Sequence, residues 1–191
     1  MIVWLALAWA WFAVHVVDRA FPRRVIRRAD DSIYLTRRFL FGFWPTPQGW
    51  RGGPEWRGKS LYVHCFHAAD ADSPCVLHTH RFAWAVSLVV LGSYVEQRAR
   101  FSAGLLDYVW RGGIRMVGGL APYRRVRWIN VLRGDSPHRV ERLERSRVWT
   151  LFLVGPRAKE GWGFLVPGRG YVPHEEWIAE RHANGGAAPS A

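Results

Sequence analysis

Lysine is almost missing from this chain, and acidic residues are few. Its 27 basic residues include only two lysines, Lys59 and Lys159, and its 15 acidic residues leave a formal net charge of +12. The excess charge is therefore arginine, whose planar guanidinium binds phosphates and carboxylates in a bidentate manner. This composition indicates either an anionic partner or the codon usage of a GC-rich genome, and we favour the second explanation.

Cysteine is also scarce, and motifs for nucleic-acid binding are absent from the sequence. Cys65 and Cys75 are the only cysteines, and two cysteines at this spacing exclude a cysteine-based zinc cluster. A disulfide between them would require an oxidising compartment, and we expect two buried thiols instead. The sequence has no zinc finger, helix-turn-helix or aromatic RNA-binding signature, so we predict no nucleic-acid partner despite the positive charge.

The length limits the chain to one substantial domain. A chain of 191 residues, 49% of them hydrophobic, is long enough for one well-filled core. We expect three parts: a hydrophobic N-terminal helix with a basic flank over residues 1–28, a barrel over residues 29–182, and a disordered tail over residues 183–191.

The N-terminal segment predicts membrane attachment. Residues 1–17 carry no charged side chain, and this length is the lower limit for a membrane-spanning helix. Arginines follow this run over residues 19–28 and none precedes it, so the positive-inside tendency predicts a membrane-associated protein with its barrel on the cytoplasmic side. The alternative is a helix packed against the barrel or in the interface of a homo-oligomer.

Short apolar runs between glycine and proline turns predict β-strands along the rest of the chain. Residues 44–59 are rich in both turn formers and predict a loop, whereas residues 173–181 have a helical pattern. We expect strands over residues 33–43, 61–67, 84–91, 94–97 and 148–154. A hairpin is expected at Gly92-Ser93, and a hairpin at residues 69–73 would be needed to place Cys65 and Cys75 opposite each other.

His78 and His80 form the first candidate metal-binding feature. Side chains alternate along an extended strand, so two histidines separated by one residue point to the same face and can reach one metal ion. A third imidazole is expected from His138, which follows a turn-forming segment at residues 134–137 and begins another β-rich run. The alternative for His138 is a core histidine bonded to the backbone.

The order of these motifs resembles that of the cupin superfamily. A His-x-His pair followed by an apolar strand and a glycine, and much later by a turn with a single histidine, is similar to its two motifs over residues 61–162. The resemblance implies an all-β, double-stranded β-helix (cupin or jelly-roll) barrel that holds a metal ion with histidines from both motifs. Residues 149–164 are also similar to the end of uncharacterised bacterial and phage cupin-like proteins.

The first motif departs from the cupin pattern at one ligand. The family usually has a glutamate four or five positions after the second histidine, where this chain has Trp84 and Ala85. Glu96 is a candidate replacement, although a two-residue turn puts it on the face opposite the histidines, and only a bulge or a longer turn reverses that parity. Trp84 shares the face of His80 in an unbroken strand, so we expect it to line a substrate pocket.

The resemblance implies a metal-dependent enzyme acting on a small molecule. Three-histidine cupins include Fe(II) dioxygenases, which the missing glutamate favours, while metal-dependent isomerases and lyases form a second class. Zinc, nickel, manganese and copper are alternatives to iron, because imidazole binds several transition metals. The alternative function is a non-catalytic, membrane-attached cupin-like module that binds a ligand or takes part in an assembly.

Overall fold

The computed structural model describes most of the predicted domain. The described residues are 16, 20–28, 31–42, 44–46, 49–51, 58–70, 76–99, 123–158, 161–166 and 169–183. Only the backbone is described for residues 44–46, 49–51 and 181–182. The predicted N-terminal helix over residues 1–17, the tail after residue 183 and Cys75 lie outside these residues, apart from Val16.

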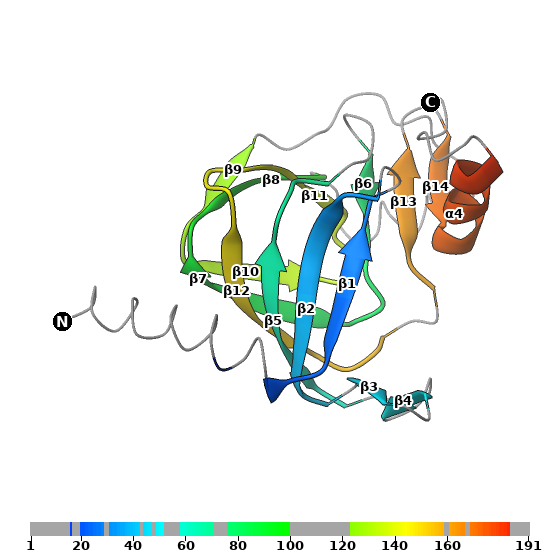
Figure 1. Cartoon of the computed structure of the whole chain (residues 1–191). Coiled ribbons are helices and arrows are strands. Elements are labelled where there is room, and N and C mark those ends of the chain that lie inside the picture. The colour runs from blue at the N-terminus through cyan, green and yellow to red at the C-terminus, as the bar shows by residue number, and fades with distance from the viewer. Residues whose placement is uncertain are drawn as a thin grey trace.

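Two six-stranded antiparallel sheets form the described structure (Figure 1). The first sheet has the strand order β1 (Arg23–Arg27), β2 (Ile33–Phe41), β5 (Ser60–Phe66), β12 (Val148–Val154), β7 (Trp84–Leu91) and β10 (Ile129–Arg133). The second has the order β14 (Gly170–Pro173), β13 (Gly163–Val166), β6 (Leu77–His78), β11 (His138–Leu143), β8 (Tyr94–Arg98) and β9 (Arg124–Val126).

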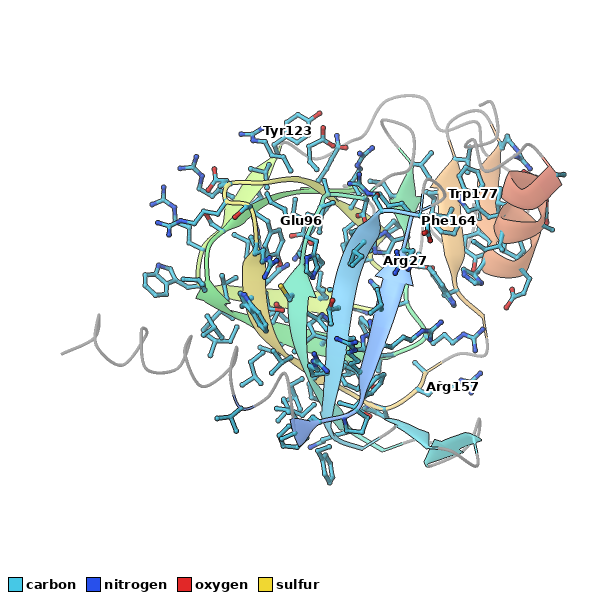
Figure 2. All side chains as sticks on the ribbon, in the orientation of Figure 1. Arg27, Glu96, Tyr123, Arg157, Phe164 and Trp177 are labelled. Atoms are coloured by element: carbon cyan, nitrogen blue, oxygen red, sulfur yellow. The ribbon has the colours of Figure 1, made fainter. Side chains whose placement is uncertain are left out.

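Two smaller elements complete the described fold. The predicted loop over residues 44–59 contains a two-stranded sheet of β3 (Trp44–Thr46) and β4 (Gly49–Arg51). The helix α4 (His174–Ala183) follows β14. Its Trp177 is fully buried with Phe164 and Val172, so one aromatic side chain attaches the helix to the second sheet (Figure 2).

Successive strands mostly alternate between the two sheets. The chain passes from β5 in the first sheet to β6 in the second, then to β7 in the first and β8 in the second, and it alternates again from β10 to β13. This winding suits a β-sandwich of the jelly-roll kind. The all-β class and the C-terminal helix are confirmed, but the described sheets remain two separate layers and do not close into the predicted barrel.

The hairpin predicted at Gly92-Ser93 is wrong. β7 pairs with β10 and β12, while β8 pairs with β9 and β11, so the strands on either side of Gly92-Ser93 belong to different sheets. Gly92 has a φ of 85°, and a Cβ there would lie 3.0 Å from the carbonyl oxygen of Arg147. This tight, left-handed backbone forms a corner between sheets. Likewise, β5 and β6 do not pair with each other.

The core lies between the two sheets. Ala85, Leu132 and Phe152 of the first sheet are buried in one cluster, and Val89 packs in another with Val140 of the second sheet. Alternation therefore places every second residue of β7 inside, as expected for a strand with one face in the core.

The basic segment after the N-terminal run contains a strand. Residues 23–27 form β1, which pairs with β2 at the edge of the first sheet. In the part of the chain that the structure describes, no helix is both long enough and apolar enough to cross a bilayer.

Candidate metal centre

The structure brings His78, His80 and His138 together. His78 ends β6 and lies opposite His138, the first residue of β11, in the ladder between these strands. Their ring centroids are 4.7 Å apart, and the His80 ring lies 4.9 Å from that of His78 and 5.0 Å from that of His138. The three possible ligand atoms lie within 4.8 Å of one another. We call these residues the histidine group.

A glycine lets the two motifs approach each other. The backbone N–H of His80 donates to the carbonyl of Gly134 at 2.9 Å, and the N–H of Gly134 donates to Ala83 at 3.1 Å. A Cβ at Gly134 would lie 1.6 Å from the carbonyl oxygen of Phe82. Any side chain would therefore push the turn before His138 away from the segment that carries His80.

Thr79, between the two histidines, fixes the other side of this segment. Its N–H donates to the carbonyl of Gly163 at 2.9 Å, and its hydroxyl accepts the Gly163 N–H at 3.1 Å. Thr79 is 1% exposed. The buried threonine thus points to one side of the chain while both neighbouring histidines point to the other.

The nitrogen separations suit a shared metal ion. Nε2 of His80 and Nε2 of His138 are 3.3 Å apart, and two imidazole nitrogens bound to one ion at about 2.1 Å are roughly 3.0 to 3.4 Å apart at bond angles between square and tetrahedral. The Nδ1 of His138 lies 3.2 Å from the carbonyl oxygen of Ser136. When Nδ1–H donates to that carbonyl, the lone pair of Nε2 is directed at the group.

Asp70 lies beside His78, outside the histidine group. Its Oδ2 lies 3.7 Å from Nδ1 of His78 and accepts the backbone N–H of Val140 at 2.6 Å. A carboxylate on the far nitrogen of an imidazole orients the ring and increases the basicity of the ligand nitrogen. Asp70 was not predicted from the sequence, because it lies in an irregular segment with no motif spacing to either histidine.

Burial keeps His138, the most buried residue of the histidine group, in its neutral form. Burial lowers the pKa of His138 well below 6.5, and the nearby His78 and Arg98 lower this pKa further, whereas the hydrogen bond that His138 donates to the Ser136 carbonyl raises it. Neutral imidazole is the form that ligates a metal. His138 therefore needs no deprotonation near neutral pH to act as a ligand.

The aromatic rings of Phe82 and Trp162 cover His80. Phe82 stacks on His80 with 4.5 Å between centroids, and Trp162 lies parallel to it at 6.5 Å. Trp84 instead lies beside Gly155, where an added Cβ would meet its indole at 2.5 Å. The unbroken strand assumed for the parity of His80 and Trp84 is not present, because β7 begins only at Trp84.

Glu96 does not join the histidine group. Its carboxylate is 1% exposed between the sheets (Figure 2), where it accepts from Arg98 at 3.0 Å and from the Asn130 amide at 3.2 Å. The same amide donates to the Tyr94 hydroxyl at 2.8 Å. Glu96, the candidate replacement ligand, is instead part of an internal network in which it pairs with Arg98.

Comparisons with known proteins give only distant similarities. No family model matches the chain, and no curated protein matches it. Among solved structures, Fe(II)-HppE with the alternative substrate (S)-1-HPP is 12% identical over 74% of this chain and 58% of its own, with a TM-score of 0.41.

Two further structures are similar at the same level. The hydroxypropylphosphonic acid epoxidase from S. wedmorenis is 12% identical over 74% of this chain and 57% of its own, with a TM-score of 0.37. A structure of the DMSP lyases RdDddP and RnDddQII is 14% identical over 66% and 48%, with a TM-score of 0.35. The chain spans about half the length of these structures, and TM-scores this low do not assign it to a family.

Proposed function

We propose that this chain is a metal-dependent enzyme of the cupin type, in which the histidine group holds a divalent transition metal and a small molecule is the substrate. The observation that carries the proposal is the 3.3 Å approach of the His80 and His138 Nε2 atoms, with His78 alongside. Three imidazoles leave coordination positions for a substrate. We favour Fe(II) and an oxidoreductase of the dioxygenase type, in which the metal supplies the activation of oxygen.

Each residue around the group has a separate task in this proposal. Asp70 orients His78, and the Ser136 carbonyl fixes the tautomer of His138. Phe82 and Trp162 limit the access of water beside His80. Glu96 contributes no ligand, so the set contains three histidines and no acid. We also propose that residues 1–17 attach the protein to a membrane, with the folded domain on the cytoplasmic side.

Metal content tests the proposal directly. The full chain is extracted in detergent without exposure to oxygen, and its metals are measured by mass spectrometry for the natural sequence, His78→Ala, His138→Ala and His67→Gln. His67 is the matched control because it contacts Thr36 at 3.0 Å rather than the histidine group. We expect about one equivalent of metal in the natural sequence and in His67→Gln, and its loss from both alanine variants.

The same measurement separates the two functional classes. Metal retained in both alanine variants would place its binding elsewhere in the chain. Failure of the natural sequence to take up Fe(II), Mn(II), Ni(II), Cu(II) or Zn(II) on reconstitution would contradict the enzyme and support a non-catalytic binding or assembly module. Substrate assays follow only with the metal that binds.

A further inference from the structure

The outward face of the first sheet is apolar at its β7–β10 edge. Ile129 and Val131 of β10 are 62% and 57% exposed, and Leu88 of β7 is 41% exposed. Ile129 lies opposite Leu88 in the ladder, and Val131 lies opposite Val86. Cross-strand partners share a face, so these side chains form one continuous apolar surface. Outward faces of antiparallel sheets that meet water are usually polar.

The same apolar face continues into the sheet. Leu151 of β12 lies opposite Leu88 on one side and opposite Val63 of β5 on the other. Val63 belongs to a buried cluster against which Phe21 packs. Phe21 follows the apolar run of residues 1–17 by four positions. The exposed edge and the entry of the N-terminal segment therefore belong to one face.

A basic, tryptophan-containing turn borders the apolar surface. Trp128, in the turn between β9 and β10, is 70% exposed. A depression of about 320 Å³ is lined by Arg124, Arg125, Arg127 and Trp128 together with Val126 and Ile129. Figure 1 shows β9 and β10 on the same side of the molecule as β7. An arginine-lined hollow beside exposed apolar side chains suits a phosphate headgroup above acyl chains.

We propose that the membrane-facing patch, defined as Leu88, Trp128, Ile129 and Val131 with Arg124, Arg125 and Arg127, docks onto an anionic phospholipid surface. The apolar side chains enter the interfacial region, and Arg127 contacts headgroup phosphates. Arg124 and Arg125, which donate to Asn130 and Glu144, add positive charge beside it. A second copy of the chain fits less well, because an isologous contact brings the same arginines of both copies together. The proposal does not depend on the metal centre.

Radical footprinting in nanodiscs tests this patch in the full chain. Oxidation of Trp128 is measured by mass spectrometry in discs of pure phosphatidylcholine and in discs in which one lipid in four is phosphatidylglycerol. Phe41, which is 58% exposed outside the patch, is the internal reference. We expect oxidation of Trp128 to fall about tenfold in the anionic discs relative to the neutral ones, with partial recovery at high salt, because surface attraction is screened. Phe41 should not change.

Variants separate docking from simple tethering by the N-terminus. Ile129→Thr combined with Val131→Thr keeps β-branched residues in the strand and should restore oxidation of Trp128 in anionic discs, whereas the control Ile33→Thr should not. Equal oxidation in both lipids, whether high or low, would overturn the proposal. If oxidation of Trp128 is low in both lipids and native mass spectrometry shows a doubled mass, a second copy of the chain occupies the patch. If oxidation is low in both lipids and the mass is that of a monomer, this chain's own N-terminal segment covers the patch.

Discussion

His64 and His138 are both buried imidazoles, at 3% and 5% exposure, but the chain surrounds them differently. At His64, the Arg37 guanidinium donates to Nε2 at 2.9 Å, and Phe152 stacks on the ring at 4.7 Å. At His138, Nε2 faces Nε2 of His80. An imidazole that accepts from arginine has no lone pair left for a metal, because its other nitrogen carries the proton.

The comparison extends to the buried acid. Glu96 accepts a hydrogen bond from Arg98 between the sheets. It resembles His64, which accepts from Arg37. The histidine group differs because its ring nitrogens converge on each other. Residue type and burial alone therefore do not distinguish a structural residue from a candidate metal ligand. The group that faces its lone pair does distinguish them.

Removing Glu96 should have the largest effect on stability. Glu96→Ala leaves the Arg98 guanidinium and the Asn130 amide without this acceptor, and breaking a buried ion pair typically costs about 3 to 5 kcal/mol. Denaturant unfolding measures the loss. Glu180→Ala, which removes a surface pair with Arg169, is the control and should have a much smaller effect. Metal content should stay unchanged in both, and its loss in Glu96→Ala under folding conditions would return Glu96 to the ligand set.

Replacing His64 should affect stability and leave the metal in place. His64→Phe keeps an aromatic ring beside Phe152 but removes the acceptor of Arg37, at a cost of about 1 to 3 kcal/mol. Adding Arg37→Leu should recover part of this loss, which a double-mutant cycle measures. Additive losses, or a metal content below that of the natural sequence, would break the proposed distinction between His64 and the histidine group.

Asp70 should tune metal affinity without being a ligand. Asp70→Asn keeps the shape of the side chain but removes the charge near Nδ1 of His78, and losing such a supporting carboxylate typically weakens metal binding about 10- to 100-fold. Competition with a chelator of known affinity measures the change. Asp135→Asn, which alters a surface partner of Arg133, is the matched control. An unchanged affinity in Asp70→Asn would mean that Asp70 only fixes the backbone at Val140.

Acid should destabilise the metal-free protein through His64 and His138. Burial lowers the pKa of each below 6.5, whereas in the unfolded chain histidine titrates near 6.5. The unfolded state therefore binds more protons below that pH, and stability falls as pH drops through 6.5, by at most about 1.4 kcal/mol per pH unit for each histidine. His64→Phe should reduce this slope by its own share in pH-dependent unfolding. The same slope in both proteins would contradict a neutral, buried His64.

Several features of the site follow from local sequence patterns. The one-residue spacing of His78 and His80, and the turn before His138, are local, and the structure brings all three residues together. Asp70, Phe82 and Trp162 were not predicted, because their contacts with the group depend on how irregular segments cross between sheets. No local sequence pattern predicts where these segments pass from one sheet to the other.

The β-rich class, the C-terminal helix and the three histidines of the group could all be predicted from the sequence, because alternation, turn residues and short motif spacing act over a few residues. Which strands pair with one another depends on the three-dimensional fold. At Gly92 the chain turns from one sheet into the other, and this corner removes the register on which the prediction for Glu96 rested. Pairing between distant strands depends on packing across the whole core. Glu96 therefore pairs with Arg98. Trp84 lies beside Gly155.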